Sequence, residues 1–275
     1  MTSPPLSLNE WKAEIKSWQE TLETSVVGRN MAVLPTVGST NTYAKNHPDL
    51  PQGAVVVAWE QTAGRGQRDR KWSSEPGGLY LTAKLVFEDA TPHPFWVVSA
   101  VAFGVMDGLT TFGLTPTLKW PNDVLVGGKK IAGVLTDVTQ QGCCLVMYVG
   151  VGVNVRNDLG SIQALFPDLK DKTTSVSDEL GSEDVSLTPL LVGICRSLDR
   201  YLHHSPPFDH SLMREQWLGK AGLFGKIVVV KDLTTEEVTT GVVTDLTPHG
   251  ALLVTKETGE QTEVLTGDLV SVRPT

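Results

Sequence analysis

The sequence predicts an α+β protein with a larger N-terminal domain and a small C-terminal antiparallel barrel. Its 275 residues suffice for two domains at roughly 150 residues each. Helical and extended patterns alternate over residues 8–220, whereas the remainder holds short extended segments at intervals of about ten residues, separated by turn residues. We therefore expect one domain at residues 1–221, beginning with a helical extension at residues 1–30, and a second at residues 222–275.

Helices are expected where apolar residues recur at intervals of three and four. Residues 8–23 show this spacing, with Ser7 as N-cap, and residues 187–202 repeat it. Residues 95–112 are largely apolar, and the glycines, aspartate and hydroxyl residues that interrupt them indicate a buried helix instead of a membrane span. A shorter helix is expected at residues 42–46.

Extended segments account for most of the chain between these helices. In the larger domain they are expected at residues 31–37, 54–59, 78–87, 117–120, 124–126, 129–139 and 145–155, and in the barrel at residues 226–230, 238–244, 250–255, 263–265 and 269–272. The segment 145–155 is apolar almost throughout, so it should be a central strand. Residues 158–183 are polar and predict a long surface loop with one short helix.

The composition excludes several classes of protein. Hydrophobic residues make up 40% and charged residues 20% of the chain, which is ordinary for a globular protein and excludes a disordered or collagen-like one. The net charge of −8 disfavours general nucleic-acid binding, which needs clustered lysine and arginine. The six histidines show no metal-ligand spacing, and no Gly-x-Ser-x-Gly motif is present.

The cysteine count and the first residues bear on the compartment. Cys143, Cys144 and Cys195 are too few for a disulfide framework, which favours a reducing compartment. The first residues lack the apolar stretch of a signal peptide. We therefore expect a cytoplasmic protein without membrane attachment.

The segment at residues 61–72 combines glycines with positive charge. Between Arg65 and Lys71 it has four basic side chains and one acidic one, within an acidic chain. Glycines let a ligand approach the backbone closely, and arginine binds carboxylate or phosphate through two parallel hydrogen bonds. The segment predicts a polyanion-binding loop, and a solvated loop with surface ion pairs is the alternative. It is neither a Walker loop nor a dinucleotide fingerprint.

A second pair of motifs offers charges of both signs. The run Lys-Trp-Pro-Asn-Asp at residues 119–123 and the run Lys-Lys-Ile-Ala-Gly at residues 129–133 place positive charge at Lys119 and Lys130. Asp123 offers a carboxylate for a metal or an amine, and a backbone turn is the alternative explanation for the motif.

Two further motifs have structural and functional interpretations. The glycines of residues 150–155 indicate close approach by a ligand or by another backbone, and both interpretations stay open. Asn154 in this apolar segment needs hydrogen-bond partners if it is buried. Ser-Thr-Asn at residues 39–41 is typical of a helix N-cap, and ligand binding is the alternative.

Taken together and in this order, the motifs resemble those of the biotin protein ligase family, the biotin–[acetyl-CoA-carboxylase] ligases. They are S-T-N at residues 39–41, Q-T-A-G-R-G-Q-R-D-R-K-W at 61–72, K-W-P-N-D at 119–123, K-I-A-G at 130–133 and G-V-G-V-N-V at 150–155. The resemblance implies a mixed-sheet catalytic domain of the biotin/lipoate ligase type and an SH3-like C-terminal barrel. Some family members also have an N-terminal helix-turn-helix. About 30 residues with one helix precede the first predicted strand here, so we expect the short form and no DNA binding.

The resemblance also implies a reaction and the residues that perform it. The carboxylate of biotin attacks the α-phosphate of ATP to give biotinyl-5′-AMP, and a lysine of a biotin carboxyl carrier protein then accepts the biotin. Biotin binding is assigned to Ser39, Thr40, Asn41, Gln61, Gly64, Arg65, Gly66, Gln67 and Lys130. Nucleotide binding is assigned to Arg68, Arg70, Trp72, Asn122 and Asn154, and catalysis to Lys130, Arg65, Asp123 and Lys119. Mg²⁺ is the expected cofactor, with Asp123 as its ligand, and a homodimer is a possible assembly.

Two positions depart from the family pattern, because many members have Arg where Gln67 stands and Gly where Asp69 stands. We expect free biotinyl-AMP to leave faster here than it would with Arg at position 67. Three alternatives stay open: a lipoate ligase or octanoyltransferase of the same superfamily, a non-catalytic biotin sensor, and an interaction protein whose function lies in the barrel.

Overall fold

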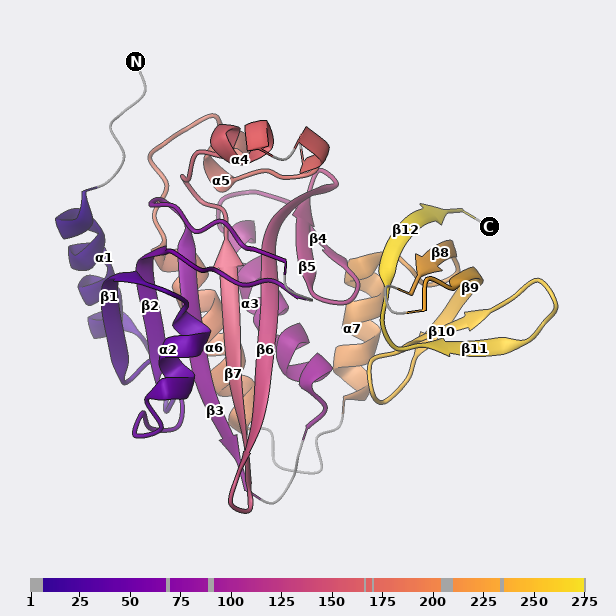
Figure 1. Cartoon of the computed structure of the whole chain (residues 1–275), viewed down its shortest axis with the longest axis horizontal. Helices are drawn as coiled ribbons and strands as arrows, with labels where there is room; N and C mark the ends of the chain where they lie inside the picture. The colour runs from indigo at the N-terminus through magenta and orange to yellow at the C-terminus, as the bar shows by residue number, and fades with distance from the viewer. Residues whose placement is uncertain are drawn as a thin grey trace.

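The computed structural model describes residues 7–67, 70–88, 92–165, 167–169, 171–203, 210–232 and 235–274, and it contains two β-sheets (Figure 1). The strands of the larger sheet are β1 (Met31–Val37), β2 (Val55–Gln61), β3 (Leu79–Phe87), β4 (Pro116–Lys119), β5 (Asp123–Val126), β6 (Lys129–Gln141) and β7 (Cys144–Val153). Their order across the sheet is β1-β2-β3-β7-β6-β5-β4. β1 and β2 are parallel and the other neighbours are antiparallel, so the sheet is mixed and β7 is central, as predicted.

The two faces of the larger sheet have different coverings. α1 (Leu8–Thr21), α3 (Pro94–Thr110) and α6 (Thr188–His203) belong to the core on one face, and α2 (Thr40–Asn46) lies on the other, in front of the sheet in Figure 1. Successive strand residues point to opposite faces. Val57 and Val149 therefore enter the core with α3, whereas Val56 and Tyr148 pack with Ala44 of α2. We call the face that carries α2 the site face.

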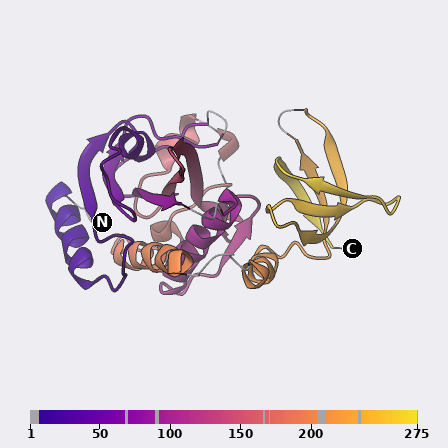
Figure 2. The same ribbon diagram turned by 90° about the horizontal axis from the view of Figure 1, so that it is seen from below.

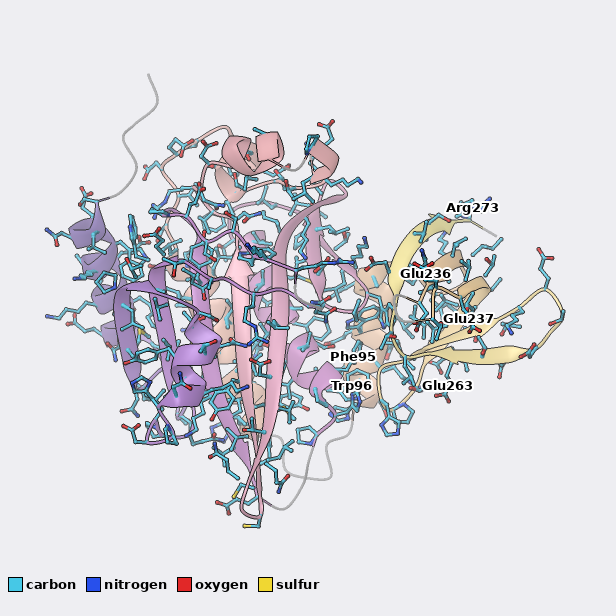
Figure 3. All side chains as sticks on the ribbon, viewed as in Figure 1. Phe95, Trp96, Glu236, Glu237, Glu263 and Arg273 are labelled. Carbon is cyan, nitrogen blue, oxygen red and sulfur yellow. The ribbon has the colours of Figure 1, made fainter. Side chains whose placement is uncertain are left out.

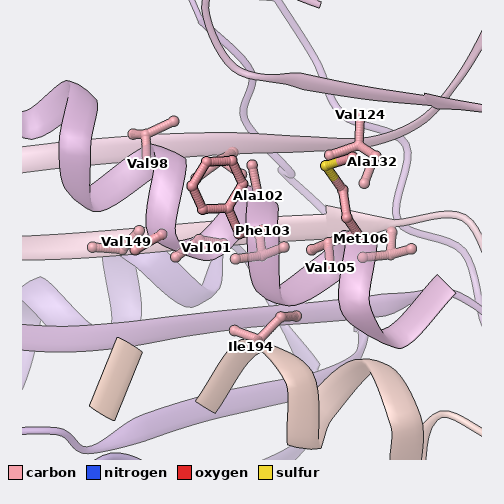
Figure 4. Close-up of a cluster of buried hydrophobic side chains, with 14 of the residues drawn as sticks. Val98, Val101, Ala102, Phe103, Val105, Met106, Val124, Ala132, Val149 and Ile194 are labelled. Atoms are coloured by element: carbon pink, nitrogen blue, oxygen red, sulfur yellow. The ribbon is translucent and has the colours of Figure 1, made fainter. Parts of the chain in front are cut away.

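The main hydrophobic core lies between α3, α6 and the sheet. Figure 4 shows part of it, with side chains of α3 beside Ala132 of β6, Val149 of β7 and Ile194 of α6. The backbones of α3 and α6 touch, because a Cβ on Gly104 would lie 2.7 Å from the Cα of Ile194. Within the described ranges, no helix has both the length and the apolar character needed to cross a bilayer.

The predicted N-terminal helix is present as α1, and its cap explains where it begins. The Ser7 side chain accepts a hydrogen bond from the backbone N–H of Glu10, and the Glu10 carboxylate accepts one from the backbone N–H of Ser7. This reciprocal pair is a capping box. Trp11, Ile15 and Trp18 are buried, so the apolar stripe read from the sequence faces the core.

A carboxylate on α6 holds the segment that follows α1. Asp199 accepts hydrogen bonds from the backbone N–H groups of Ser25, Val26 and Val27 at 2.8–2.9 Å. One acidic side chain thereby satisfies three backbone donors, and it fixes this segment against α6.

The segment 158–183 differs from the prediction of a surface loop with one short helix. It contains α4 (Gly160–Leu165), the 3-10 helix η1 (Pro167–Leu169) and α5 (Val176–Leu180). Thr174, Ser175 and Val176 are buried, with Ser175 as the N-cap of α5. The polar composition was misleading because these hydroxyl residues cap a helix and their backbone bonds to the ends of β6 and β7.

Helix α7 (Ser211–Ala221) was not predicted from the sequence. Trp217 is its buried residue, and the partly buried Met213, Leu218 and Ala221 pack against the same core, so the helix has an apolar face, but one that spans only two to three turns. It ends at Gly222, which adopts a left-handed conformation with φ 60°. Glycine reaches this region without strain, and it is the usual residue at such a helix end.

The smaller sheet confirms the predicted antiparallel C-terminal unit. Its strands are β8 (Ile227–Lys231), β9 (Val238–Leu246), β10 (Leu252–Thr255), β11 (Gln261–Val264) and β12 (Asp268–Arg273), in the order β11-β10-β9-β8-β12. All neighbouring pairs in this order are antiparallel, as in an SH3-like fold. Figure 2 shows it beside the larger sheet, beyond α7.

Aromatic residues join the smaller sheet to the larger one. The indole N–H of Trp96 donates to the carbonyl of Pro248 at 2.7 Å, and that of Trp120 donates to the carbonyl of Gly250 at 3.1 Å. Phe95 packs so closely against Gly250 that a Cβ there would enter the ring. Figure 3 shows Phe95 and Trp96 at this junction.

Candidate active site

Three glycines of β6 and β7 form a strip of the site face that has no side chains of its own. Gly133 of β6 is paired directly with Gly152 of β7, and Gly150 lies two residues earlier on the same face of β7. Because none of them has a side chain, other groups can lie against the sheet backbone here. We call Gly133, Gly150 and Gly152 the glycine floor.

Trp72 lies on the glycine floor. A Cβ on Gly152 would be 2.5 Å from the Cε2 atom of the indole, and one on Gly133 would be 3.1 Å from Cζ3. The indole N–H of Trp72 is buried without a hydrogen-bond partner among the described residues. Such a donor is costly to leave unsatisfied, so this position of the indole carries an uncompensated polar group.

A hydrogen-bonded chain connects the Ser-Thr-Asn motif to the loop that begins at Gln61. The Gln61 side-chain oxygen accepts from the backbone N–H of Thr40 at 2.8 Å, and its amide donates to Ser74 Oγ at 2.8 Å. The Thr82 hydroxyl on β3 lies 2.8 Å from Thr40 Oγ1 and 2.5 Å from Asn41 Oδ1. Thr40 and Asn41 are therefore fixed and buried, as groups that read a ligand's polar edge must be.

Asn41 lies above the third glycine of the floor. A Cβ on Gly150 would be 3.0 Å from the Asn41 Cγ, so only glycine leaves room for this amide. The Asn41 amide nitrogen is 3.3 Å from the carbonyl of Tyr148 on the same strand.

Lys130 stands at the start of β6 beside Trp72. Its Nζ is 2.6 Å from Asp123 Oδ1 and lies over the Trp72 ring, 5.1 Å from the ring centroid. The backbone of Lys130 is held on both sides, because its N–H donates to Lys172 and its carbonyl accepts from Thr174. The segment that the sequence presented as surface loop thus fixes the position of this lysine.

Arg65 reaches the site face from the glycine-rich loop. Its Nη1 is 3.1 Å from Asp137 Oδ2 on β6. The loop around it is a small hairpin, in which Arg65 pairs with Lys71 and the N–H of Gly66 donates to the carbonyl of Arg70 at 2.7 Å. The Arg65 side chain is 48% exposed, so the guanidinium is accessible to a ligand from solvent.

Other residues assigned by resemblance lie around this centre with different partners. Ser39 is buried at the N-cap position of α2 without a capping side-chain bond. Lys119 is opposite Asp123 in the pairing of β4 with β5. Gly64 is buried beneath the carbonyl of Trp72, Gly66 is half-buried, and Gln67 is exposed in the loop. Arg68 and Asp69 lie outside the described residues.

Three of the residues assigned to the nucleotide make structural contacts here. Arg70 forms a 2.7 Å ion pair with Asp268 of β12. The Asn122 amide donates to the carbonyl of Val134, and the Asn154 amide donates to that of Thr174. Their role toward a nucleotide stays a prediction, because the contacts described here are with groups of the protein itself.

Several site residues were not identified from the sequence. Thr82 and Asp137 contact the predicted residues directly, and Ser74 orients Gln61. The available signal was weak: Thr82 is a polar residue in a largely apolar strand, and Asp137 is one of several polar residues in β6. Their contacts depend on which strands are neighbours, and local sequence does not state this.

A metal site can be tested against the side chains present. Within the described part of the chain, no three His, Cys, Asp or Glu residues gather in a way that could hold an ion. Asp123 is a single carboxylate, and it already forms an ion pair with Lys130. Mg²⁺ is commonly bound through one or two carboxylates together with substrate phosphates. Asp123 fits this way of binding Mg²⁺, and it does not fit a site made of protein ligands alone.

Comparison with known proteins gives a consistent family. The model of the biotin/lipoate A/B protein ligase family matches residues 33–154, and that of the biotin protein ligase C-terminal domain matches residues 223–270. The biotin--[acetyl-CoA-carboxylase] ligase of Paracoccus denitrificans is 29% identical over 241 residues, which cover 83% of this chain and 95% of that protein. The bifunctional ligase/repressor BirA of Bacillus spizizenii is 32% identical over 59% of this chain and 50% of its own length.

Solved structures agree with these sequence matches. The biotin protein ligase from Aquifex aeolicus in complex with biotin and ATP superposes with a TM-score of 0.68 and 27% identity, covering 90% of this chain and 99% of that one. The match with the longer BirA protein of Bacillus spizizenii, in contrast, covers only about half of that protein's length. The two family matches together cover well over half of the chain, on both of its sheets. The chain therefore belongs to the biotin/lipoate A/B protein ligase family, with the C-terminal domain of the biotin protein ligases.

Proposed function

We propose that this chain is a biotin protein ligase, which activates biotin with ATP and transfers it to a lysine of a carrier protein. The observation that carries the proposal is that two cationic side chains lie along β6 on the site face, Lys130 beside Gly133 of the glycine floor and Arg65 at Asp137. Family membership and the relatives' names support the choice of biotin as substrate.

In the first step the biotin carboxylate oxygen bonds to the α-phosphorus of ATP, and the bond to the bridging oxygen breaks, so pyrophosphate leaves. Both reactants are anions, so positive charge must be present before they can approach. Lys130 has three N–H donors, of which Asp123 takes one, and Arg65 has five, of which Asp137 contacts one nitrogen. The remaining donors can bind carboxylate and phosphate oxygens and stabilise the charge that develops on them.

The glycine floor suits the uncharged ring of biotin. The Trp72 indole that lies on Gly133 and Gly152 offers an apolar face to a bicyclic ring, and Thr40, Asn41 and Gln61 provide polar groups at its edge. Trp72 must share this strip with any ligand, and its N–H has no partner among the described residues. Holding both substrates together makes the reaction effectively intramolecular.

Mg²⁺ fits the proposal as a partner of the ATP phosphates, with Asp123 as its single protein ligand. When bound, it supplies positive charge that offsets the phosphates. Arg65 and Lys130 then have the separate task of orienting the carboxylate toward the α-phosphorus.

In the second step a lysine amine of the carrier attacks the carbonyl carbon of biotinyl-AMP. A C–N bond forms, the bond from the carbonyl carbon to the phosphate oxygen breaks, AMP leaves, and the nitrogen loses a proton. The half-exposed position of Arg65 leaves this side of the site open to a macromolecular acceptor. The ligase names of the relatives support a biotin carboxyl carrier protein as that acceptor.

The test is to incubate the purified chain with ATP, Mg²⁺ and either biotin or lipoate, and to measure pyrophosphate release. Release with biotin alone supports the proposal, whereas release with lipoate alone selects the lipoate ligase. A carrier domain should then become biotinylated. Its variant with arginine in place of the acceptor lysine should not. Adenylate binding without carrier labelling would indicate a non-catalytic sensor. Light scattering tests the homodimer, and a gel shift with biotin and ATP tests the expected lack of DNA binding.

A further inference from the structure

Asp137 is an acidic residue on the site face that no motif includes. It lies on β6 with its carboxylate directed at the loop, and its side chain is only 16% exposed. Its Oδ2 atom is 3.1 Å from Arg65 Nη1 and 3.4 Å from Asn41 Nδ2. One carboxylate oxygen therefore contacts two residues that the proposed function uses.

The contact with Arg65 leaves most of the guanidinium available. It joins one nitrogen to one oxygen, so it is not the bidentate pairing in which arginine and a carboxylate occupy each other fully. Arginine has five N–H donors in a rigid fork. Arg65 can therefore keep its bond to Asp137 while its other donors bind an anion.

Arg65 also lies in a loop that needs an anchor. Gly64 and Gly66 flank it, and glycine has the greatest conformational freedom to lose on ordering. Of the ion pairs made by the described residues of this loop, one is Arg65 with Asp137 and the other is Arg70 with Asp268, where both side chains are largely exposed. Exposed pairs contribute little, so the mostly buried Asp137 is the stronger anchor.

We infer that Asp137 is a positioning residue that holds Arg65, and with it the loop, in place for the anionic substrates before they bind. This inference rests on the proposed function, because the ligand of Arg65 is taken to be the biotin carboxylate and the ATP phosphate. Asp137 acts through Arg65 and touches no substrate in this scheme. Among the described residues, Arg65 is the ion-pair partner of Asp137.

The pairing of Arg65 with Asp137 predicts how the single and double variants should differ. Asp137→Asn should raise the KM for biotin by about threefold to tenfold with kcat within about twofold, a modest effect because Arg65 is half exposed. Arg65→Ala should lose far more, because it leaves the Asp137 carboxylate without its ion-pair partner beside an anionic substrate. Asp137→Asn should therefore partly restore kcat/KM when it is added to Arg65→Ala.

The kinetic test compares wild type, the two single variants and the double variant, with Asp107→Asn as a control for loss of an ion-paired aspartate elsewhere. Asp107→Asn should match the wild type. If Asp137→Asn lowers kcat/KM by the same factor in both backgrounds, Asp137 does not act through Arg65 and the inference is overturned. An unchanged KM in Asp137→Asn overturns it equally.

A second measurement does not depend on the reaction. Trypsin cleaves after arginine and lysine, so cleavage within residues 65–71 reports how often this loop leaves the sheet. Asp137→Asn should be cut there severalfold faster than wild type, and Asp107→Asn at the wild-type rate. If wild type makes no biotinyl-AMP, the proposed function fails, and equal cleavage rates would still overturn the role of Asp137.

Discussion

Replacing Gly152 by alanine should displace Trp72 from the glycine floor. The new Cβ would lie 2.5 Å from Cε2 and 3.0 Å from Cζ2 of the indole. Carbon atoms in contact are normally about 3.5–4.0 Å apart, so the ring has to move by about 1 Å. The strand cannot yield instead, because Gly152 is paired with Tyr80 on one side and Gly133 on the other.

A shift of this size is enough to affect catalysis. Misplacement of a reacting or positioning group by about 1 Å can cost about 10²-fold in rate. Trp72 also contacts Lys130, so its displacement disturbs the lysine that we place at the reacting carboxylate. We expect kcat/KM for biotin-dependent pyrophosphate release to fall by about two orders of magnitude in Gly152→Ala.

The matched control is Gly219→Ala in α7, where an added Cβ would meet nothing within 4 Å. Alanine at such a helical position should be neutral or stabilise the protein by up to about 1 kcal/mol, with wild-type activity. Both variants should show cooperative thermal unfolding, which excludes misfolding as the cause. If Gly152→Ala releases pyrophosphate within twofold of the wild-type rate, the contact between Trp72 and the floor does not matter for the reaction.

Three further predictions concern charge. Lys130→Ala and Arg65→Ala should each slow pyrophosphate release by about 10²-fold or more, because each removes a cation from the transition state; wild-type rates would contradict the site. Gln67→Arg should slow the release of free biotinyl-AMP in a filter-binding assay, and equal off-rates would refute this. Burial tends to raise the pKa of Asp199, but the backbone N–H groups it accepts from lower it overall. Asp199→Ala should therefore cost about 1–3 kcal/mol of unfolding free energy at pH 7. That difference should shrink as the pH falls below about 3.8, the usual value, where the wild type also loses the contribution; a difference independent of pH would refute the assignment.

Most of the secondary structure follows from local pattern. The stripe of α1 and its cap residue Ser7 were visible in the sequence, as was the apolar run that became the central strand β7. Pattern did not reveal α7, whose apolar face spans only two to three turns, or the short helical turns of residues 158–183. Their positions depend on tertiary contacts: α7 packs against the main core, and residues 172–177 bond to the backbone of residues 130, 154 and 155.

The candidate site shows the same division. The order of the motifs predicted that Thr40, Asn41, Gln61 and Lys130 belong to one site, and the structure brings them onto one face of the sheet. For the residues that anchor them, such as Asp137, the sequence showed only a polar side chain in a strand.

The sequence by itself determined the helices and strands with regular spacing, the glycines that leave room on β6 and β7, and the family to which the motifs point. Only the tertiary structure decided that β7 lies between β3 and β6, which brings Thr82, Gly150 and Asn41 together. The reason is that periodicity records which face of an element is buried. Which strand lies next to another, and in what register, depends on packing across the whole sheet.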